Sequence, residues 1–172
     1  MDVDFEQLAR QCAPWVHAET LSGIVAQETG FKTLLININR DKEKRKGYKL
    51  ERQPTNKAEA IATAENLIRQ GFNIDVGIGQ INSDNLPKYG FTVARAFDAC
   101  ENLALAGSIF YWNYEEALKK YNGDEHSAAL AALSKYNTGS FVNGFSNGYV
   151  QKVINNIAKN KNKPPRIVKL LP

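Results

Sequence analysis

A single glutamate, Glu28, combines a chemically useful side chain with an unusual position. It lies four residues after Ile24 and seven after Leu21, so the 3.6-residue period of a helix carries it onto the same apolar face. Gly30 is expected to end this helix soon afterwards. Burial and the negative end of the helix dipole would both disfavour the charged form of this carboxyl group. A carboxyl group that stays protonated near neutral pH suits general acid catalysis, whereas the alternative is an exposed glutamate at a fraying helix end.

A glycine-rich segment, residues 77–82, follows about fifty residues later. Its two glycines, Gly77 and Gly79, allow the backbone to approach a ligand closely. The side-chain amides of Gln80 and Asn82 both donate and accept hydrogen bonds. These properties suit recognition of the N-acetyl groups of a glycan, and the alternative is a purely structural turn.

Three short motifs in order resemble the signatures of the lysozyme-like lytic transglycosylases of bacterial cell walls. The family signatures Glu-Ser-x-Phe, Gly-Leu-Met-Gln and Ala-Tyr-Asn correspond to residues 28–31, 77–80 and 135–137. The flanking residues look like those of the transglycosylase component of type IV secretion and conjugation systems. The resemblance covers roughly residues 5–158.

This resemblance implies a lysozyme-like domain that cleaves the β-1,4 bond between N-acetylmuramic acid and N-acetylglucosamine in peptidoglycan. Glu28 would protonate the leaving oxygen while the acetamido oxygen of the substrate assists departure. The Glu28 carboxylate would then take the proton of the 6-hydroxyl as that oxygen closes on C1. The product is a 1,6-anhydro ring, and no water is consumed. The implied partners are peptidoglycan strands and components of a secretion or conjugation machine, with no cofactor and no metal.

Four other residues are expected to belong to the same site, and the resemblance favours the role given to the first of them. The Tyr136 hydroxyl is expected to hydrogen-bond and orient the Glu28 carboxyl, with a core tyrosine as the alternative. Thr29 replaces the family's serine, and its hydroxyl is expected to do similar work in substrate binding. Asn137 is expected to turn the chain at a helix end beside the substrate. Tyr149 is expected to line the glycan cleft, with a packing role as the alternative.

Asp75 is the best candidate for a second carboxylate, which hydrolytic glycosidases use as nucleophile or base. In that case the chain would be a hydrolytic muramidase. The sequence of residues 73–77 favours instead a turn in which the aspartate oxygen accepts hydrogen bonds from nearby backbone amides. A third possibility is a non-catalytic glycan-binding assembly module. Glu28 argues against it, because a binding module needs no carboxyl group at that place.

Gly79 stands where many relatives have methionine, so one apolar wall of the cleft is expected to be missing.

The composition limits the class of protein but does not identify its substrate. The 172 residues suffice for one domain with a substantial core, and 43% of them are hydrophobic. The net charge of +4 is compatible with nucleic acid, with membrane surfaces or with an anionic polymer such as peptidoglycan. The two histidines have no metal-ligand spacing, and there is no apolar run of membrane-spanning length. The basic segment 40–52 has Tyr48 as its one aromatic residue, so nucleic-acid binding is not expected.

The two cysteines and the N-terminus bear on the compartment. Cys12 and Cys100 are 88 residues apart, and the resemblance implies an oxidising compartment where they would form a disulfide. Two buried free thiols are the alternative. Residues 1–6 are acidic and lack the apolar region of a signal peptide. We therefore expect a periplasmic protein whose signal peptide is absent from this sequence, with a cytoplasmic protein as the alternative.

The expected fold is α+β and mostly α, namely a lysozyme-like fold with a small β lobe. Residues 1–160 are predicted to form the transglycosylase domain, and the basic, proline-containing tail 161–172 is predicted to be disordered. A strand is predicted at 35–39 and loops at 40–52 and 72–82. Helices are predicted at 3–12, 19–29, 55–70, 101–121, 125–136 and 146–160.

Overall fold

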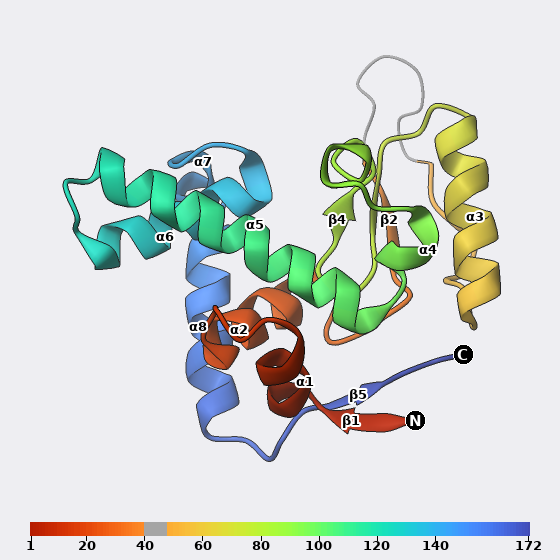
Figure 1. The fold of residues 1–172 in the computed structure, drawn as a ribbon, viewed down its shortest axis with the longest axis horizontal. Coiled ribbons are helices and arrows are strands. Elements are labelled where there is room, and N and C mark those ends of the chain that lie inside the picture. Colours follow the sequence, from red (N-terminus) through yellow and green to blue (C-terminus); the bar gives the residue numbers. More distant parts are fainter. Residues whose placement is uncertain (40–47) are drawn as a thin grey trace.

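The structure is a computed structural model in which residues 1–39 and 48–172 are described (Figure 1). Helices dominate the described residues, which confirms the expected α+β, mostly α class. The helices are α1 (Phe5–Cys12), α2 (Ala18–Glu28), α3 (Lys57–Arg69), α4 (Val93–Ala96), α5 (Ala99–Lys120), α6 (Glu125–Thr138), α7 (Asn143–Ser146) and α8 (Tyr149–Lys161), with a 3-10 turn η1 (Pro87–Tyr89).

The small β lobe is a three-stranded antiparallel sheet of β2 (Ile36–Ile38), β3 (Ile74–Val76) and β4 (Ile81–Asn82). The strand predicted at 35–39 is confirmed as β2, whereas the loop predicted at 72–82 is wrong because β3 and β4 lie within it. Strands β3 and β4 have only three and two residues, and glycines lie between them. Such short strands do not show a clear alternation of apolar and polar side chains in the sequence. Residues 40–47 of the predicted charged loop lie outside the described residues.

Helix α5 crosses the middle of the molecule and separates the β lobe from the helical lobe (Figure 1). Its buried side chains face two hydrophobic cores. Leu103 and Phe110 pack in the core of the helical lobe, whereas Leu105 and Ala106 pack under the sheet. Tyr136 of α6 packs against both cores, so a single pair of helices fixes how the two lobes meet.

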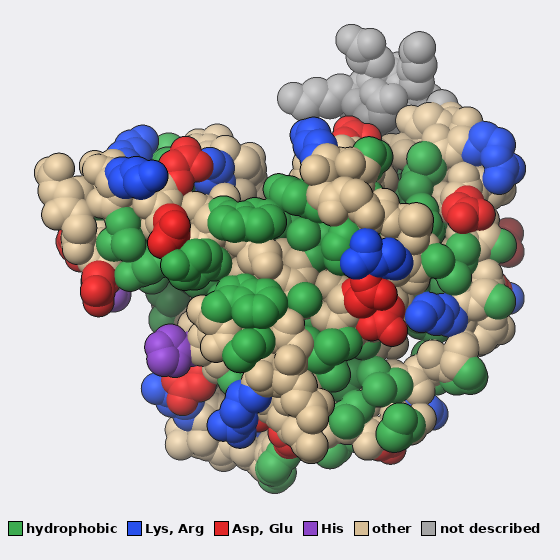
Figure 2. All heavy atoms as spheres, viewed as in Figure 1, with side chains coloured by type: hydrophobic (Ala, Val, Ile, Leu, Met, Phe, Trp, Pro, Cys, Tyr) green, Lys and Arg blue, Asp and Glu red, His purple; other side chains and the backbone are tan. Residues whose placement is uncertain are grey.

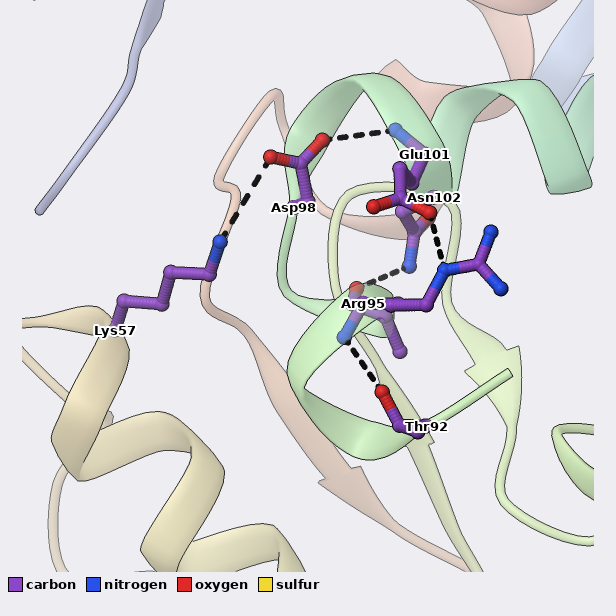
Figure 3. A network of polar contacts seen from close by, with 7 residues as sticks. Lys57, Thr92, Arg95, Asp98, Glu101 and Asn102 are labelled. Atoms are coloured by element: carbon purple, nitrogen blue, oxygen red, sulfur yellow. Dashed lines mark hydrogen bonds and ion pairs between the residues drawn. The ribbon is translucent and has the colours of Figure 1, made fainter.

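The turn that leads into α5 is held by polar side chains from three elements (Figure 3). Asp98 caps α5 by accepting a hydrogen bond from the Glu101 amide at 2.9 Å, and Lys57 of α3 lies 3.7 Å from its other oxygen. Thr92 caps α4 in the same way, and Arg95 of α4 pairs with Glu101. These exposed ion pairs each contribute little stability, but the caps define where α5 begins.

Asn102, the next residue along α5, is fully buried, and both the oxygen and the nitrogen of its side-chain amide are hydrogen-bonded. Its Oδ1 accepts from the Gly79 amide at 2.8 Å, and its Nδ2 donates to the carbonyls of Val76 and Ala96. The glycine-rich segment is thereby attached to α5. A Cβ on Gly77, whose φ is +76°, would lie 2.5 Å from the Ala96 oxygen, so only glycine fits there.

The two ends of the chain pair with each other. Strand β1 (Asp2–Asp4) runs antiparallel to β5 (Ile167–Lys169), and Val168 is completely buried. The predicted disordered tail is therefore wrong for these residues, because Val168 and the β1 ladder provide packing and hydrogen bonds that composition does not reveal. The helix predicted from residue 3 begins instead at Phe5, with Asp4 as its cap. The domain boundary at residue 160 stays a prediction.

The disulfide between Cys12 and Cys100 is confirmed. It joins the last residue of α1 to the first turn of α5, with the two Cα atoms 5.2 Å apart. In the chain-entropy model, closing a loop of this size contributes about 4 to 5 kcal/mol to the free energy of unfolding. The bond fastens α5 beside Asn102, close to where the two lobes meet.

Replacing Asn102 by alanine should destabilise the domain strongly. The change leaves one amide and two carbonyls without their partners, and each buried unpaired group costs about 1 to 3 kcal/mol. We expect the free energy of unfolding to fall by at least about 3 kcal/mol in urea titrations. The control Asn66→Ala, on the exposed face of α3, should change it by less than about 0.5 kcal/mol. Equal effects would contradict the role given to Asn102.

Candidate active site

Glu28 is the last residue of α2, as its place in the helical pattern predicts. Leu21, Ile24 and Val25 on the same helix are buried in the core of the helical lobe. The helix lies close against α8: a Cβ on Gly23 would come within 2.4 Å of the Ile157 side chain. The Glu28 side chain itself is largely buried, and Tyr149 at the start of α8 contacts its carboxyl group.

The environment of Glu28 favours its protonated form. The pKa of the carboxyl group is raised from 4.5 to about 7, chiefly by burial and to a smaller extent by the nearby negative charge of Asp75. A hydrogen bond from Tyr149 opposes this increase, because it stabilises the carboxylate. A pKa of about 7 is suited to a group that must both give and take a proton near neutral pH.

Tyr149, and not Tyr136, makes the hydrogen bond to Glu28. The Tyr149 hydroxyl donates to Glu28 Oε1 at 2.6 Å, while the Tyr136 hydroxyl donates to the Gly79 carbonyl at 2.6 Å. The predicted bond from Tyr136 to Glu28 is therefore wrong. Gly148, with φ of +81°, starts α8 at Tyr149 and thereby directs this side chain towards α2. Burial and the adjacent Glu28 carboxylate raise the pKa of Tyr149, so its hydroxyl stays a donor.

Three of the residues expected to bind substrate have structural contacts instead. The buried Thr29 hydroxyl lies 3.2 Å from the Val25 carbonyl and 3.0 Å from the Ile78 carbonyl, and so joins α2 to the glycine-rich segment. Gly77 packs against the α4–α5 turn. A Cβ on Gly79 would lie 2.7 Å from the Ala106 side chain. The absent methionine side chain therefore leaves room for α5 and for the Tyr136 hydroxyl.

A cavity of about 490 Å³ opens beside Glu28 between the sheet, η1, α5 and α6. The predicted residues Gln80, Asn82, Tyr136 and Asn137 line it together with Glu28, whereas Tyr149 lies behind its wall. Most of the lining side chains are polar. The structure thus brings most of the predicted site into one cleft.

A larger cavity of about 600 Å³ lies elsewhere, between α1, α2, α8 and the C-terminal segment. Of its acidic residues, Asp4 caps α1 by accepting from the Gln7 amide, and the exposed Glu6 and Glu19 form ion pairs with Arg10 and Lys161. Such groups are solvated and paired, so this cavity offers no acid comparable to Glu28.

Asp75 is the other carboxyl group that lines the cleft among the described residues. It sits in the middle of β3, between Asn37 of β2 and Asn82 of β4. Asp75 Oδ1 accepts from Asn82 Nδ2 at 2.8 Å, and Asn39 also donates a hydrogen bond to its carboxyl group. The predicted turn is therefore wrong, since side-chain amides of neighbouring strands take the place of backbone amides. Burial raises the pKa of Asp75 despite these two bonds.

The remaining amides of the sheet hold one another. Asn73 and Asn82 exchange a pair of hydrogen bonds at 3.0 and 2.8 Å. Gln80 adopts a positive φ of 53°, accepts from Asn37 and donates to the carbonyls of Leu35 and Gly77. The polar side chains on the sheet side of the cleft thus form two hydrogen-bonded groups, and these bonds hold the side chains in place before any ligand arrives.

Two residues that line the cleft, Asn113 and Lys135, were not predicted from the sequence. Asn113 lines the cleft, is 9% exposed and has no hydrogen-bond partner for its side chain within the described part of the chain. Lys135 also lines the cleft and pairs with Glu116 of α5.

No group of metal-ligating side chains occurs among residues 1–39 and 48–172. Within the same residues, every helix is too short or too polar to cross a membrane.

A mostly helical domain with a small antiparallel sheet, and with the largely buried acid Glu28 at the cleft between them, has the lysozyme-like architecture. The chain belongs to the Transglycosylase SLT domain family, whose sequence model matches residues 8–162. This match confirms the family expected from the three motifs.

The curated relatives carry a narrower name. The type IV secretion system protein virB1 of Brucella abortus biovar 1 is 43% identical over 157 residues, covering 88% of this chain and 63% of the relative. Protein virB1 of Agrobacterium fabrum is 35% identical over 150 residues, covering 87% and 58%. The chain therefore spans about three-fifths of the length of these relatives. No solved structure matches it significantly.

Replacing Tyr149 by phenylalanine should change both the rate and its pH dependence. The change removes the bond that stabilises the Glu28 carboxylate, so the pKa of Glu28 should rise and the alkaline limb of kcat/KM should move to higher pH. Loss of orientation should also lower kcat, by roughly 10²-fold if the acid moves about 1 Å. Tyr136→Phe is the matched control, since it leaves the Glu28 bond in place and should not move the limb upward.

The raised pKa of Glu28 also predicts a pH-dependent stability. The unfolded chain loses this proton near pH 4.5 and the folded chain near pH 7, so the folded state binds more protons in between. Stability from this group is complete below pH 4.5 and is lost as the pH rises through 7. Relative to wild type, Glu28→Gln should therefore gain up to about 3 kcal/mol between pH 4.5 and 8. In urea titrations, Glu19→Gln, an exposed change on the same helix, should show no comparable gain.

Proposed function

We propose that this domain is a lytic transglycosylase that cleaves peptidoglycan strands. The observation that carries the proposal is Glu28, a buried carboxyl group with a pKa of about 7 at the side of a polar, amide-rich cleft. Membership in the Transglycosylase SLT domain family supports the same reaction. The net charge of +4 suits an anionic polymer as substrate.

In the proposed reaction, the Glu28 proton passes to the oxygen that leaves N-acetylmuramic acid. The acetamido group of the substrate stabilises the positive charge that develops at C1. The Glu28 carboxylate, held by Tyr149, then accepts the proton of the 6-hydroxyl as that oxygen bonds to C1. Glu28 ends the cycle protonated, and the strand ends in a 1,6-anhydro ring.

The contacts of Asp75 argue against a hydrolytic reaction with this residue as nucleophile. Its carboxyl group already accepts hydrogen bonds from Asn82 and Asn39, and burial raises its pKa. Its clearest influence on the site is electrostatic, because its charge raises the pKa of Glu28. The substrate's own 6-hydroxyl therefore serves as the nucleophile in our proposal.

We further propose that the reaction opens the cell wall locally for a type IV secretion or conjugation machine, in the periplasm. The names of the virB1 relatives support this role, and the Cys12–Cys100 disulfide fits an oxidising compartment. Components of that machine are the expected protein partners.

Mass spectrometry of digested peptidoglycan tests the reaction directly. We expect products with 1,6-anhydro ends, lighter by one water than the products of hydrolysis. Glu28→Gln should abolish nearly all cleavage, because an amide cannot donate the proton. Asp75→Asn should keep most activity and move the alkaline limb to lower pH, since it removes a charge that raises the pKa of Glu28. Reducing-end products, or an Asp75→Asn loss as severe as that of Glu28→Gln, would establish a hydrolase.

A further inference from the structure

A separate cavity of about 540 Å³ lies between the segment that joins α1 to α2, the middle of α5 and the start of α6. Among the described residues, none lines both this cavity and the cleft that contains Glu28. Both histidines of the chain, His17 and His126, belong to its lining. Figure 2 shows histidine side chains, in purple, on either side of a hollow in which hydrophobic side chains are visible. The proposed reaction makes no use of this cavity.

Four aromatic side chains line the cavity, and two of them are unusually exposed. Trp15 is 46% exposed and Tyr111 38% exposed, whereas Phe110 is buried and Tyr114 half-buried. The Tyr111 hydroxyl donates to Glu115 at 2.7 Å, which holds the ring in one orientation. Exposed aromatic side chains that gather in one cavity, in contrast to single scattered ones, mark an interaction site.

The wall that carries Trp15 is fastened to α5. The disulfide between Cys12 and Cys100 lies just before this segment in the sequence and joins it to the first turn of α5. A Cβ on Gly107 would lie 2.9 Å from the Ala13 side chain and 3.5 Å from the Trp15 indole nitrogen, so the glycine lets the segment lie directly on α5. The cavity is therefore formed before a ligand arrives, which lowers the entropy lost on binding.

The lining carries a negative charge, although the chain as a whole carries +4. Glu125 is its carboxylate, and no lysine or arginine of the described residues takes part in the lining. The two histidines are neutral at pH 7. Glu125 is exposed and has no ion pair within residues 1–39 and 48–172. Burial and the charge of Glu125 raise the pKa of Tyr114, so the carboxylate lies near an aromatic ring of the cavity.

Two helices begin at this cavity, and their partial positive charges alone would attract an anion. Helix α6 starts with Asp124 as its cap and Glu125 as its first residue, and α2 carries Glu19 in its first turn. These carboxylates already offset the helix ends. An anionic ligand would find no lysine or arginine among the described lining residues, so a cation is the better match.

An arginine side chain fits this combination best. Its planar guanidinium group stacks on aromatic faces while its N–H groups donate to a carboxylate, and it is more weakly hydrated than the ammonium group of lysine. Trp15 and Tyr111 provide the faces, and Glu125 provides the carboxylate. A cavity of about 540 Å³ also has room for apolar side chains beside such an arginine, since ligand pockets measure roughly 300 to 1,000 Å³.

We propose that this cavity is a docking site for a protein partner, which inserts an arginine of an exposed segment between Trp15, Tyr111 and Glu125. A protein is the source because the sugars of a glycan strand carry no cation to pair with Glu125. Arginine and tryptophan are also enriched among the residues that contribute most to protein–protein binding. The inference goes beyond the proposed reaction at Glu28 and does not depend on it.

The two tryptophans of the chain allow this cavity to be observed alone. Trp112 lies on α5 outside the cavity, so Trp112→Phe leaves Trp15 as the single indole emitter. The probe is a blocked heptapeptide, Gly-Ser-Leu-Arg-Leu-Ser-Gly. Its control carries citrulline in place of arginine, because citrulline has nearly the same shape without the charge.

Titration of the Trp112→Phe protein at pH 7 should change the Trp15 emission in a saturable way with the arginine peptide. The citrulline peptide should bind about tenfold more weakly, because it lacks the charge that the rings and the carboxylate attract. Glu125→Gln should weaken binding of the arginine peptide about threefold, as expected for an exposed ion pair. Glu65→Gln, an exposed change of the same charge on α3, should leave the affinity unchanged.

Three outcomes of this titration overturn the docking site. The first is a Trp15 emission that stays constant at millimolar arginine peptide. The second is equal affinity for the two peptides, which would describe a purely apolar pocket. The third is a Trp15 response to purified peptidoglycan strands and not to the peptide, which would assign the cavity to the cell wall.

Cleavage of peptidoglycan separates this site from the candidate active site. Trp15→Ala and Glu125→Gln should both keep the wild-type kcat and KM, since neither residue lines the cleft. A loss of cleavage in both variants, with unchanged circular dichroism, would place the cavity in the reaction and overturn the docking role. If wild type makes no anhydro ends, the proposed function fails, and the peptide titration still decides the docking site.

Discussion

The arrangement of the cleft depends on one buried amide, that of Asn102. Two of its hydrogen bonds, with the Gly79 amide and the Val76 carbonyl, attach the segment from Val76 to Gly79 to the first turns of α5, and a third joins it to the Ala96 carbonyl at the end of α4. That segment carries the Gly79 carbonyl, which accepts from Tyr136, and the Ile78 carbonyl, which accepts from the hydroxyl of Thr29. The sheet, α5, α6 and the end of α2 are therefore connected through a few polar contacts within an apolar interior, where such contacts are strong and their loss is costly.

The state of Glu28 follows from this framework. The pKa of its carboxyl group is raised to about 7 chiefly because the side chain is largely buried, and also because the sheet holds Asp75 close enough for its charge to disfavour a second negative charge. The amide network keeps Asp75 in that position, and Tyr149 limits how far the pKa rises. The pKa of Glu28 is thus set by residues from three separate stretches of the sequence, namely the end of α2, strand β3 and the start of α8.

Local sequence features predicted the parts of this design that arise from local physics. The helical period placed Glu28 on a buried face, and helix boundaries near Gly71 and in the Glu125–Thr138 segment were recognisable from their ends. The contact between Tyr149 and Glu28 joins residues 121 positions apart. It also depends on Gly148, which adopts the left-handed backbone conformation at the start of α8. No local sequence pattern therefore predicts this contact. The role of Asp75 and the pairing of the tail with β1 were missed for the same reason, because both come from strand partners distant in sequence.

The pairing of β1 with β5 has a consequence for how the chain folds. The contact between Met1 and Leu170 joins residues that are 169 positions apart in the sequence. The hydrogen bonds within α5 or α6, in contrast, join residues that are only a few positions apart. Joining such distant points requires the loss of loop-closure entropy, which must be offset by contacts already made. The terminal ladder is therefore expected to form late, after the helices have assembled, and to be among the first parts of the domain to fray.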